Sequence, residues 1–127
     1  IPYDDSTPSD TEGDKYLEVV HETKFAARVR IVVNINLASN TTGHMTVALF
    51  RDGASGCIAA TSQYIGTVDK QHSISLVYEW EAPAASRTYS VRAGLDAANT
   101  TTLNGVAGAR KLGGGNISSI SVTEFRG

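Results

Sequence analysis

Hydrophobic and polar residues alternate with a period close to two along most of this chain from Tyr16 onward. A period of two places successive side chains on opposite faces of a β-strand, so each alternating run predicts a strand with one face in a core. The clearest run is RVRIVVNINLA, residues 28–38, in which every second residue from Val29 to Leu37 is aliphatic. Further alternating runs cover residues 45–52, 73–82, 87–95 and 117–125.

The segments between these runs are rich in Asn, Thr and Gly, and no segment has a helical pattern of useful length. KYLEVVHETKFAARV, residues 15–29, could form a short helix, but its valines and the β-branched run that follows favour a strand and a corner. Several short strands at near-regular spacing are typical of a β-sandwich or barrel. The sequence therefore predicts an all-β, antiparallel β-sandwich.

The first fifteen residues, IPYDDSTPSDTEGDK, have a different composition. They hold two of the three prolines and five acidic residues, which indicates an extended lead-in rather than a packed element. We expect residues 1–15 to form this lead-in and residues 16–127 to form one domain. A chain of 127 residues is long enough to bury a core of its own. Its one cysteine, Cys57, allows no intrachain disulfide and fits a chain folded in a reducing cytoplasm.

Four apolar residues fall on strand faces that a monomeric sandwich would turn to water. Several outward apolar positions suggest a second buried surface, as in an oligomer that packs sheet against sheet. The alternative is that the chain's own loops cover both faces of these strands. The candidates for a trimer interface are Val32, Ala48, Phe50 and Val77.

No residue pattern in the chain indicates catalysis, a metal or a cofactor. The three histidines lie in separate segments, and Glu79 and Glu81 should project from one solvated strand face. Gly113–Gly115 lead into a strand-like run rather than a helix, so we interpret them as a corner before a last strand in the middle of a sheet, not as a phosphate loop. A net charge of −2 argues against a nucleic-acid partner.

Four ordered segments together resemble the distal knob domains of tailed-bacteriophage tail needles and tail fibres. They are IPYDDSTPSDTEGDKYL, MTVALFRDG, RTYSVRAGLDAANTTTLNG and GARKLGGGNISSISVTEF, which span nearly the whole chain. The resemblance implies a jelly roll of the tumour-necrosis-factor and adenovirus-knob type. It also implies a homotrimer that follows a coiled-coil or fibrous stalk of the same chain.

The resemblance implies a role in the virion, at the distal tip of a phage tail, for a protein made in the bacterial cytoplasm. The favoured role is the non-enzymatic tip of a tail needle, which contacts the host cell envelope during attachment, penetration and DNA ejection. The first alternative is a tail-fibre adhesin that recognises lipopolysaccharide or an outer-membrane protein. The second alternative is a signalling ligand similar to tumour necrosis factor or C1q.

Basic residues are the candidates for contact with a host glycan, lipid or protein. Arg110 and Lys111 should be exposed at a hairpin end. Arg28, Arg30 and Arg92 could concentrate positive charge where copies of the chain meet, unless Glu residues from neighbouring subunits occupy those positions.

Overall fold

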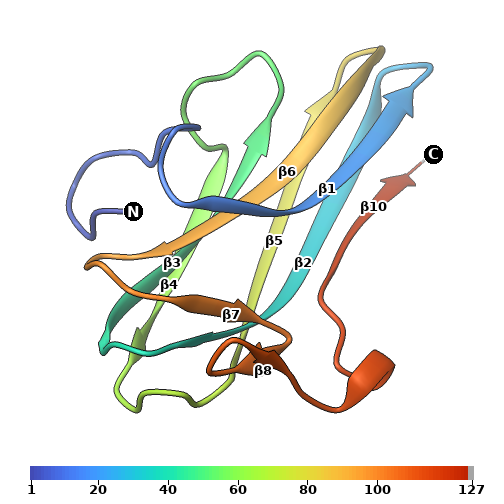
Figure 1. The fold of residues 1–127 in the computed structure, drawn as a ribbon. Helices are drawn as coiled ribbons and strands as arrows, with labels where there is room; N and C mark the ends of the chain where they lie inside the picture. The colour runs from blue at the N-terminus through green and yellow to red at the C-terminus, as the bar shows by residue number, and fades with distance from the viewer. Residues whose placement is uncertain (126–127) are drawn as a thin grey trace.

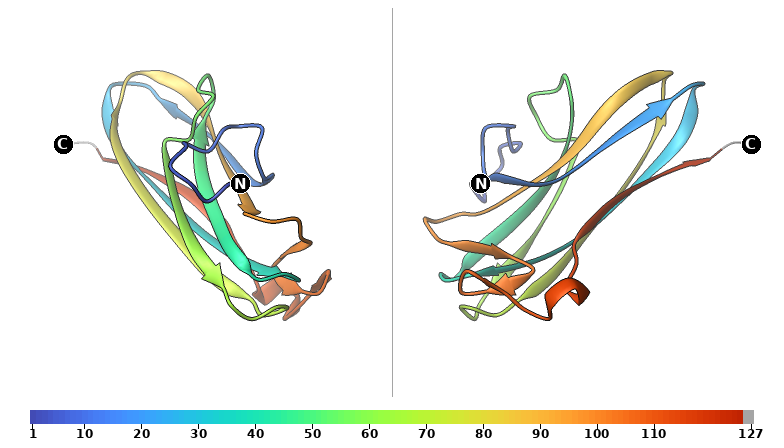
Figure 2. Two further views of the ribbon diagram at one scale, coloured as in Figure 1. Left: turned by 90° about the vertical axis from the view of Figure 1, so that its left-hand side faces the viewer. Right: turned by 45° about the vertical axis from the view of Figure 1, so that its right-hand side comes forward.

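The structure is a computed structural model that describes residues 1–125. Most of its strands form two antiparallel sheets that pack face to face, so the predicted antiparallel β-sandwich is confirmed, and a short two-stranded sheet, β8-β9, lies beside them (Figures 1 and 2). The β6 sheet has the order β1-β6-β3-β4, and the β2 sheet has the order β10-β2-β5, with β7 also paired to β2. The strands are β1 (Asp14–Thr23), β2 (Ala27–Ser39), β3 (Gly43–Arg51), β4 (Ala59–Ile65), β5 (His72–Ala82), β6 (Ala85–Leu95), β7 (Thr101–Leu103), β8 (Gly105–Val106), β9 (Ala109–Arg110) and β10 (Ser119–Phe125).

The core lies between the two sheets and uses the alternating positions that the sequence predicts. Every second residue of β2 from Val29 to Leu37 is fully buried, and β3 and β6 contribute the facing aliphatic side chains. Tyr89 is the largest fully buried side chain, and its hydroxyl accepts a hydrogen bond from Nε1 of Trp80 at 3.3 Å. This bond lets the core bury a phenol without leaving its polar end unpaired.

The last strand, β10, lies at an edge of its sheet, so the expectation that it lies in the middle is wrong. It pairs with β2 alone, although Ile120 and Val122 do pack against the core as expected. The preceding corner is a 3-10 turn at Gly113–Gly115. Only Gly113 has a positive φ, +52°, and a side chain added at Gly114 would meet no atom within 4 Å. The corner therefore requires one glycine rather than three.

The lead-in does not extend away from the domain but packs along the outward side of the β6 sheet. Its first residue, Ile1, is 9% exposed, and its nitrogen donates a hydrogen bond to the Leu95 carbonyl at 3.1 Å. The chain can approach this closely because Gly94 has no side chain: a Cβ there would lie 3.0 Å from the Ile1 nitrogen and 3.2 Å from the Cα of Gly13.

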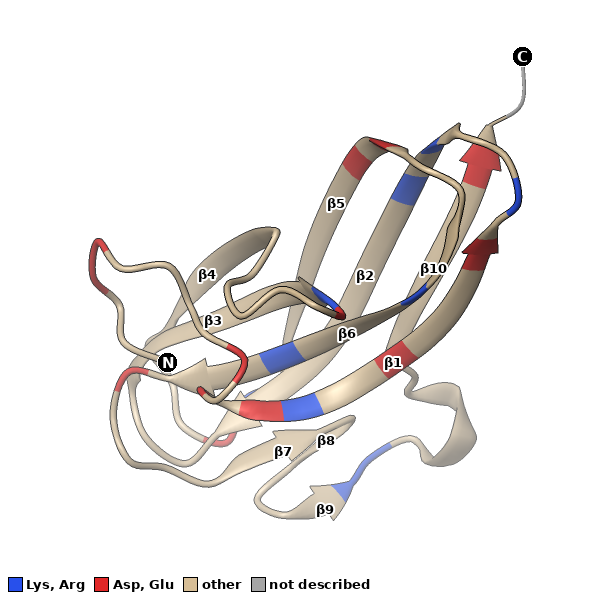
Figure 3. Cartoon of the chain, turned by 90° about the horizontal axis from the view of Figure 1, so that it is seen from above, with Lys and Arg blue, Asp and Glu red and all other residues tan. Residues whose placement is uncertain are grey.

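Two further contacts hold the lead-in in place. The Arg92 guanidinium, on the outward side of β6, donates to the carbonyls of Glu12 at 2.8 Å and Gly13 at 2.7 Å. Residues 8–10 run beside the loop between β3 and β4, where the Cys57 amide donates to the Pro8 carbonyl at 3.0 Å. In Figure 3 the lead-in and this loop lie on the same side of the β6 sheet.

The lead-in and the β3–β4 loop explain why two of the expected interface residues are buried. Ala48 is fully buried and Phe50 is 3% exposed, although both point away from the core. Their cover is the chain's own residues, which is the alternative that the sequence left open. Ala48 and Phe50 are therefore covered within one chain, and their assignment to a trimer interface stays a prediction.

We expect Arg92→Met to lower the free energy of unfolding by about 1–3 kcal/mol, because it removes two charge-assisted hydrogen bonds and leaves two carbonyls unpaired. Urea denaturation measures the loss, and amide hydrogen exchange should show faster exchange in residues 1–13. Arg110→Met is the matched control, since Arg110 also donates to two backbone carbonyls but in an exposed loop. Unchanged exchange in the lead-in of Arg92→Met would contradict this role.

Gly113→Ala should destabilise the domain by about 1 kcal/mol, because the left-handed backbone conformation at that position is less favourable for a residue with a Cβ. Gly114→Ala should leave the midpoint of thermal unfolding unchanged, since its side chain would meet open space. Comparison of the two melting curves tests the assignment, and equal losses would show that the whole glycine run is constrained.

Candidate functional site: the open face of the β2 sheet

The outward side of the β2 sheet forms an accessible surface that we call the open face. It consists of the alternate residues of three neighbouring strands that point away from the core. The open face contains Arg28, Arg30, Val32, Asn34 and Asn36 of β2, Ser73, Ser75, Val77, Glu79 and Glu81 of β5, and Ser119, Ser121, Thr123 and Phe125 of β10.

One half of the open face is a ladder of short polar side chains. The Ser75 hydroxyl donates to the Asn34 side-chain oxygen at 2.7 Å, and the Ser73 hydroxyl donates to the Asn36 side-chain oxygen at 2.6 Å. Next to this ladder, Val32 and Val77 are directly opposite each other across the strands. Val77 is 59% exposed, so a small apolar patch remains on the open face.

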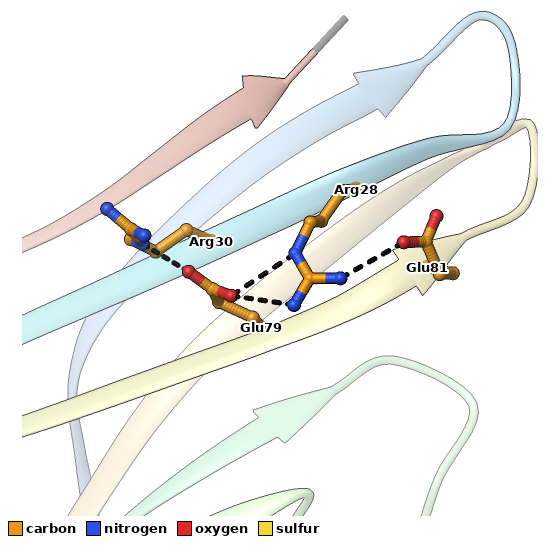
Figure 4. A network of polar contacts seen from close by, with 4 residues as sticks. All are labelled: Arg28, Arg30, Glu79 and Glu81. Carbon is orange, nitrogen blue, oxygen red and sulfur yellow. Dashed lines mark hydrogen bonds and ion pairs between the residues drawn. The ribbon is translucent and has the colours of Figure 1, made fainter. Parts of the chain in front are cut away.

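The other half of the open face is a group of four charged residues, shown in Figure 4. Arg28 lies between two carboxylates, at 3.0 Å from Glu79 and 3.3 Å from Glu81. Glu79 also accepts a hydrogen bond from Nε of Arg30. The Phe125 ring lies 5.1 Å from the Arg30 guanidinium carbon and stacks on it. The two arginines are thus paired within one chain.

The pairing shifts the pKa of each partner in the direction that favours its charged form. Hydrogen bonds from Arg30 and then Arg28 lower the pKa of Glu79, and the hydrogen bond to Glu79 raises the pKa of Arg28. The four side chains therefore stay charged at neutral pH, and Glu79 offsets much of the positive charge that an anion would meet here.

The other basic candidates lie elsewhere, so the five do not form one site. Arg92 is on the outward side of the opposite sheet, where its guanidinium binds the lead-in. Arg110 donates to the carbonyls of Gly113 at 2.7 Å and Asn116 at 3.2 Å. Lys111 is exposed in the loop after β9, as expected for a hairpin end.

Two side-chain groupings were not predicted from the sequence. Trp80 lies between two guanidiniums, with Arg51 at 4.4 Å and Arg87 at 4.9 Å from its ring. His44 stacks on Tyr3 with ring centroids 3.8 Å apart and contacts Tyr64 edge-on at 5.1 Å. The alternation of β3 and β4 does place His44 and Tyr64 on one face, but no pattern shows that the lead-in brings Tyr3 there.

The described part of the chain gives no support to a metal site or a reactive thiol. Within residues 1–125 no group of three His, Cys, Asp or Glu residues could hold a metal ion, and no helix is suited to crossing a membrane. Cys57 is half-buried, and burial raises the pKa of its thiol. No protein-family model matches the sequence, and no curated protein sequence is a significant match.

Glu79→Gln tests the four-residue charge group. Because its partners lower the pKa of Glu79, its contribution to stability is present above pH ~4.5 and is lost as the pH falls through the lower pKa of the folded state. We expect the variant to melt at a lower temperature than the parent at pH 7, and the difference to shrink below pH ~4.5. Melting curves at several pH values measure it, and a difference that does not depend on pH would contradict the pairing.

Proposed function

We propose that this domain is the non-enzymatic, trimeric tip of a bacteriophage tail needle, which contacts the host cell envelope during penetration and DNA ejection. The resemblance of four ordered segments to such knobs supports this identity. A rigid and compact domain suits the end of a shaft, and short strand connections supply that rigidity.

The strand order supports the jelly-roll type. From β1 to β7 the chain crosses between the two sheets at every connection except the β3–β4 hairpin. As a result, strands that are distant in sequence become neighbours, such as β1 and β6 in one sheet and β10 and β2 in the other. Such interleaved pairing is a property of jelly rolls and favours a domain that unfolds as one unit.

The proposal of a trimer rests mainly on the open face of the β2 sheet, which we take as the interface between copies of the chain. Arg28, Glu79 and the side-chain oxygens of Asn34 and Asn36 have partners within the chain, which lowers the cost of covering these groups with a second copy. Val32 and Val77 provide an apolar centre, as interfaces between subunits do. By contrast, the outward side of β3 is already covered by the chain itself.

Light scattering after size exclusion tests the proposal. We expect a mass near three times the 13.4 kDa of one chain, unchanged on dilution. Val77→Asp should give the mass of one chain because it buries an unpaired carboxylate in the interface, while circular dichroism shows an intact fold.

Val20→Asp is the matched control. Val20 is 64% exposed, similar to Val77, but it lies on β1 in the opposite sheet. This variant should remain trimeric. A parent domain that is monomeric would overturn the trimer, and loss of the trimer in both variants would show that the interface is not confined to the open face.

The adhesin alternative differs from the needle tip in requiring tight binding to one receptor. A tail-fibre adhesin would bind lipopolysaccharide or an outer-membrane protein tightly and saturably, whereas a needle tip needs a stable trimer and no more than weak contact with the envelope. Tight, saturable binding of the trimer to vesicles that carry lipopolysaccharide or an outer-membrane protein would favour the adhesin.

A further inference from the structure

A cavity lies between the lead-in and the outward side of β3 and β4. It has a volume of about 170 Å³ and is open to solvent. Its lining residues are Pro2, Tyr3, Asp4, Ser6 and Pro8 of the lead-in, Thr46 of β3, and Ala60, Thr61 and Ser62 of β4. It is on the opposite side of the sandwich from the open face.

The cavity exists because the side chains on its floor are short and because the lead-in passes over them. Thr46 and Ser62 are directly opposite each other across β3 and β4, and Ala60 follows on the same face, so the floor is made of short side chains. Pro2 and Pro8 restrict the backbone of the lead-in on either side of the cavity. The stack of Tyr3 on His44 fixes one end of this wall.

Hydroxyl groups without partners converge on the cavity. Thr46 and Ser62 project from the outward face of β3 and β4 and line the cavity, and within residues 1–125 neither hydroxyl makes a hydrogen bond. A hydroxyl can donate one hydrogen bond and accept two, so these groups suit a ligand that carries hydroxyls of its own.

Asp4 adds an acceptor to the opposite wall. Hydrogen bonds from the side chain and backbone of Ser6 lower the pKa of Asp4, so its carboxylate is ionised at neutral pH. Among residues 1–125 no lysine, arginine or histidine lines the cavity. The wall therefore accepts hydrogen bonds from a neutral ligand and repels an anionic one.

One tyrosine lines the cavity and a second lies next to the residues that do. Tyr3 lines it and is 57% exposed. Tyr64 follows Ser62 on the same face of β4, contacts the His44 ring that stacks on Tyr3, and is 58% exposed. Exposed tyrosines present a flat apolar face beside a polar hydroxyl, which matches the apolar C–H face and the hydroxyl rim of a sugar ring.

We propose that this cavity binds one uncharged sugar ring of a surface glycan, with Tyr64 stacking on the ring and Asp4, Thr46 and Ser62 bonding its hydroxyls. The inference rests on the proposed envelope contact for the source of the sugar. The binding itself is a property of one chain. It therefore holds or fails separately from the trimer.

The test is a titration followed by amide resonances of the ¹⁵N-labelled domain. The probes are the methyl glycosides of glucose, galactose, mannose, N-acetylglucosamine and rhamnose, with glucose 6-phosphate as the anionic comparison. At least one neutral glycoside should shift amides of residues 2–8, 44–46 and 60–64, with a dissociation constant in the millimolar range that suits a small ligand with few contacts. Glucose 6-phosphate should bind at least tenfold more weakly than its neutral counterpart.

Variants separate the cavity from the rest of the surface. Tyr64→Ala should weaken binding about tenfold by removing the stacking ring, which is within the range for one aromatic contact. Ser62→Leu should fill the hollow and abolish binding. Ser86→Leu is the matched control: it also places a leucine at an exposed serine, on β6, and should bind as the parent does.

Three results would overturn the proposal. They are no shift of the cavity amides with any of the five glycosides at tens of millimolar, equal binding of glucose 6-phosphate, or full binding by Ser62→Leu. A monomeric parent that still binds a glycoside would refute the trimer and leave the sugar site standing.

Discussion

The outward side of β3 carries the apolar residues Ala48 and Phe50, and the chain's own residues cover them. Arg92 holds this cover by donating to two lead-in carbonyls, and Gly94 allows the close contact with Ile1. Other features depend on this arrangement. Ala48 and Phe50 become internal, and a cavity forms where short side chains lie beneath the lead-in.

The two sides of the sandwich therefore differ in what they can do. The charged residues of the open face are paired with one another, so this face suits coverage by another protein surface. The cavity on the opposite side carries hydroxyls that lack partners, so it suits a ligand that has hydrogen-bond donors and acceptors of its own. Assembly and recognition could proceed on separate surfaces of one domain without competition.

Much of the sandwich follows from side-chain alternation, because the period of two directly determines which face of a strand is buried. The β2 run is the best example, since its five aliphatic positions are all fully buried. The place of the lead-in could not be predicted, because Arg92 binds backbone carbonyls. Every residue has a carbonyl, so the sequence does not mark the ones that Arg92 binds. For the same reason Ala48 and Phe50 looked accessible, and the partners of Arg28 and Arg30 became clear only once β2 and β5 were seen side by side.

The contacts that hold the lead-in on the β6 sheet also determine how the domain would respond to mechanical load. A pull applied through Ile1 would act first on its contact at Gly94, next on the backbone hydrogen bonds of residues 8–10 to the β3–β4 loop, and then on the two bonds of Arg92, before it reached the pairing of β1 with β6. Once released, residues 1–12 could extend to roughly 40 Å. The segment would then act as a sacrificial extensible tether, which absorbs tension while the sandwich itself stays folded.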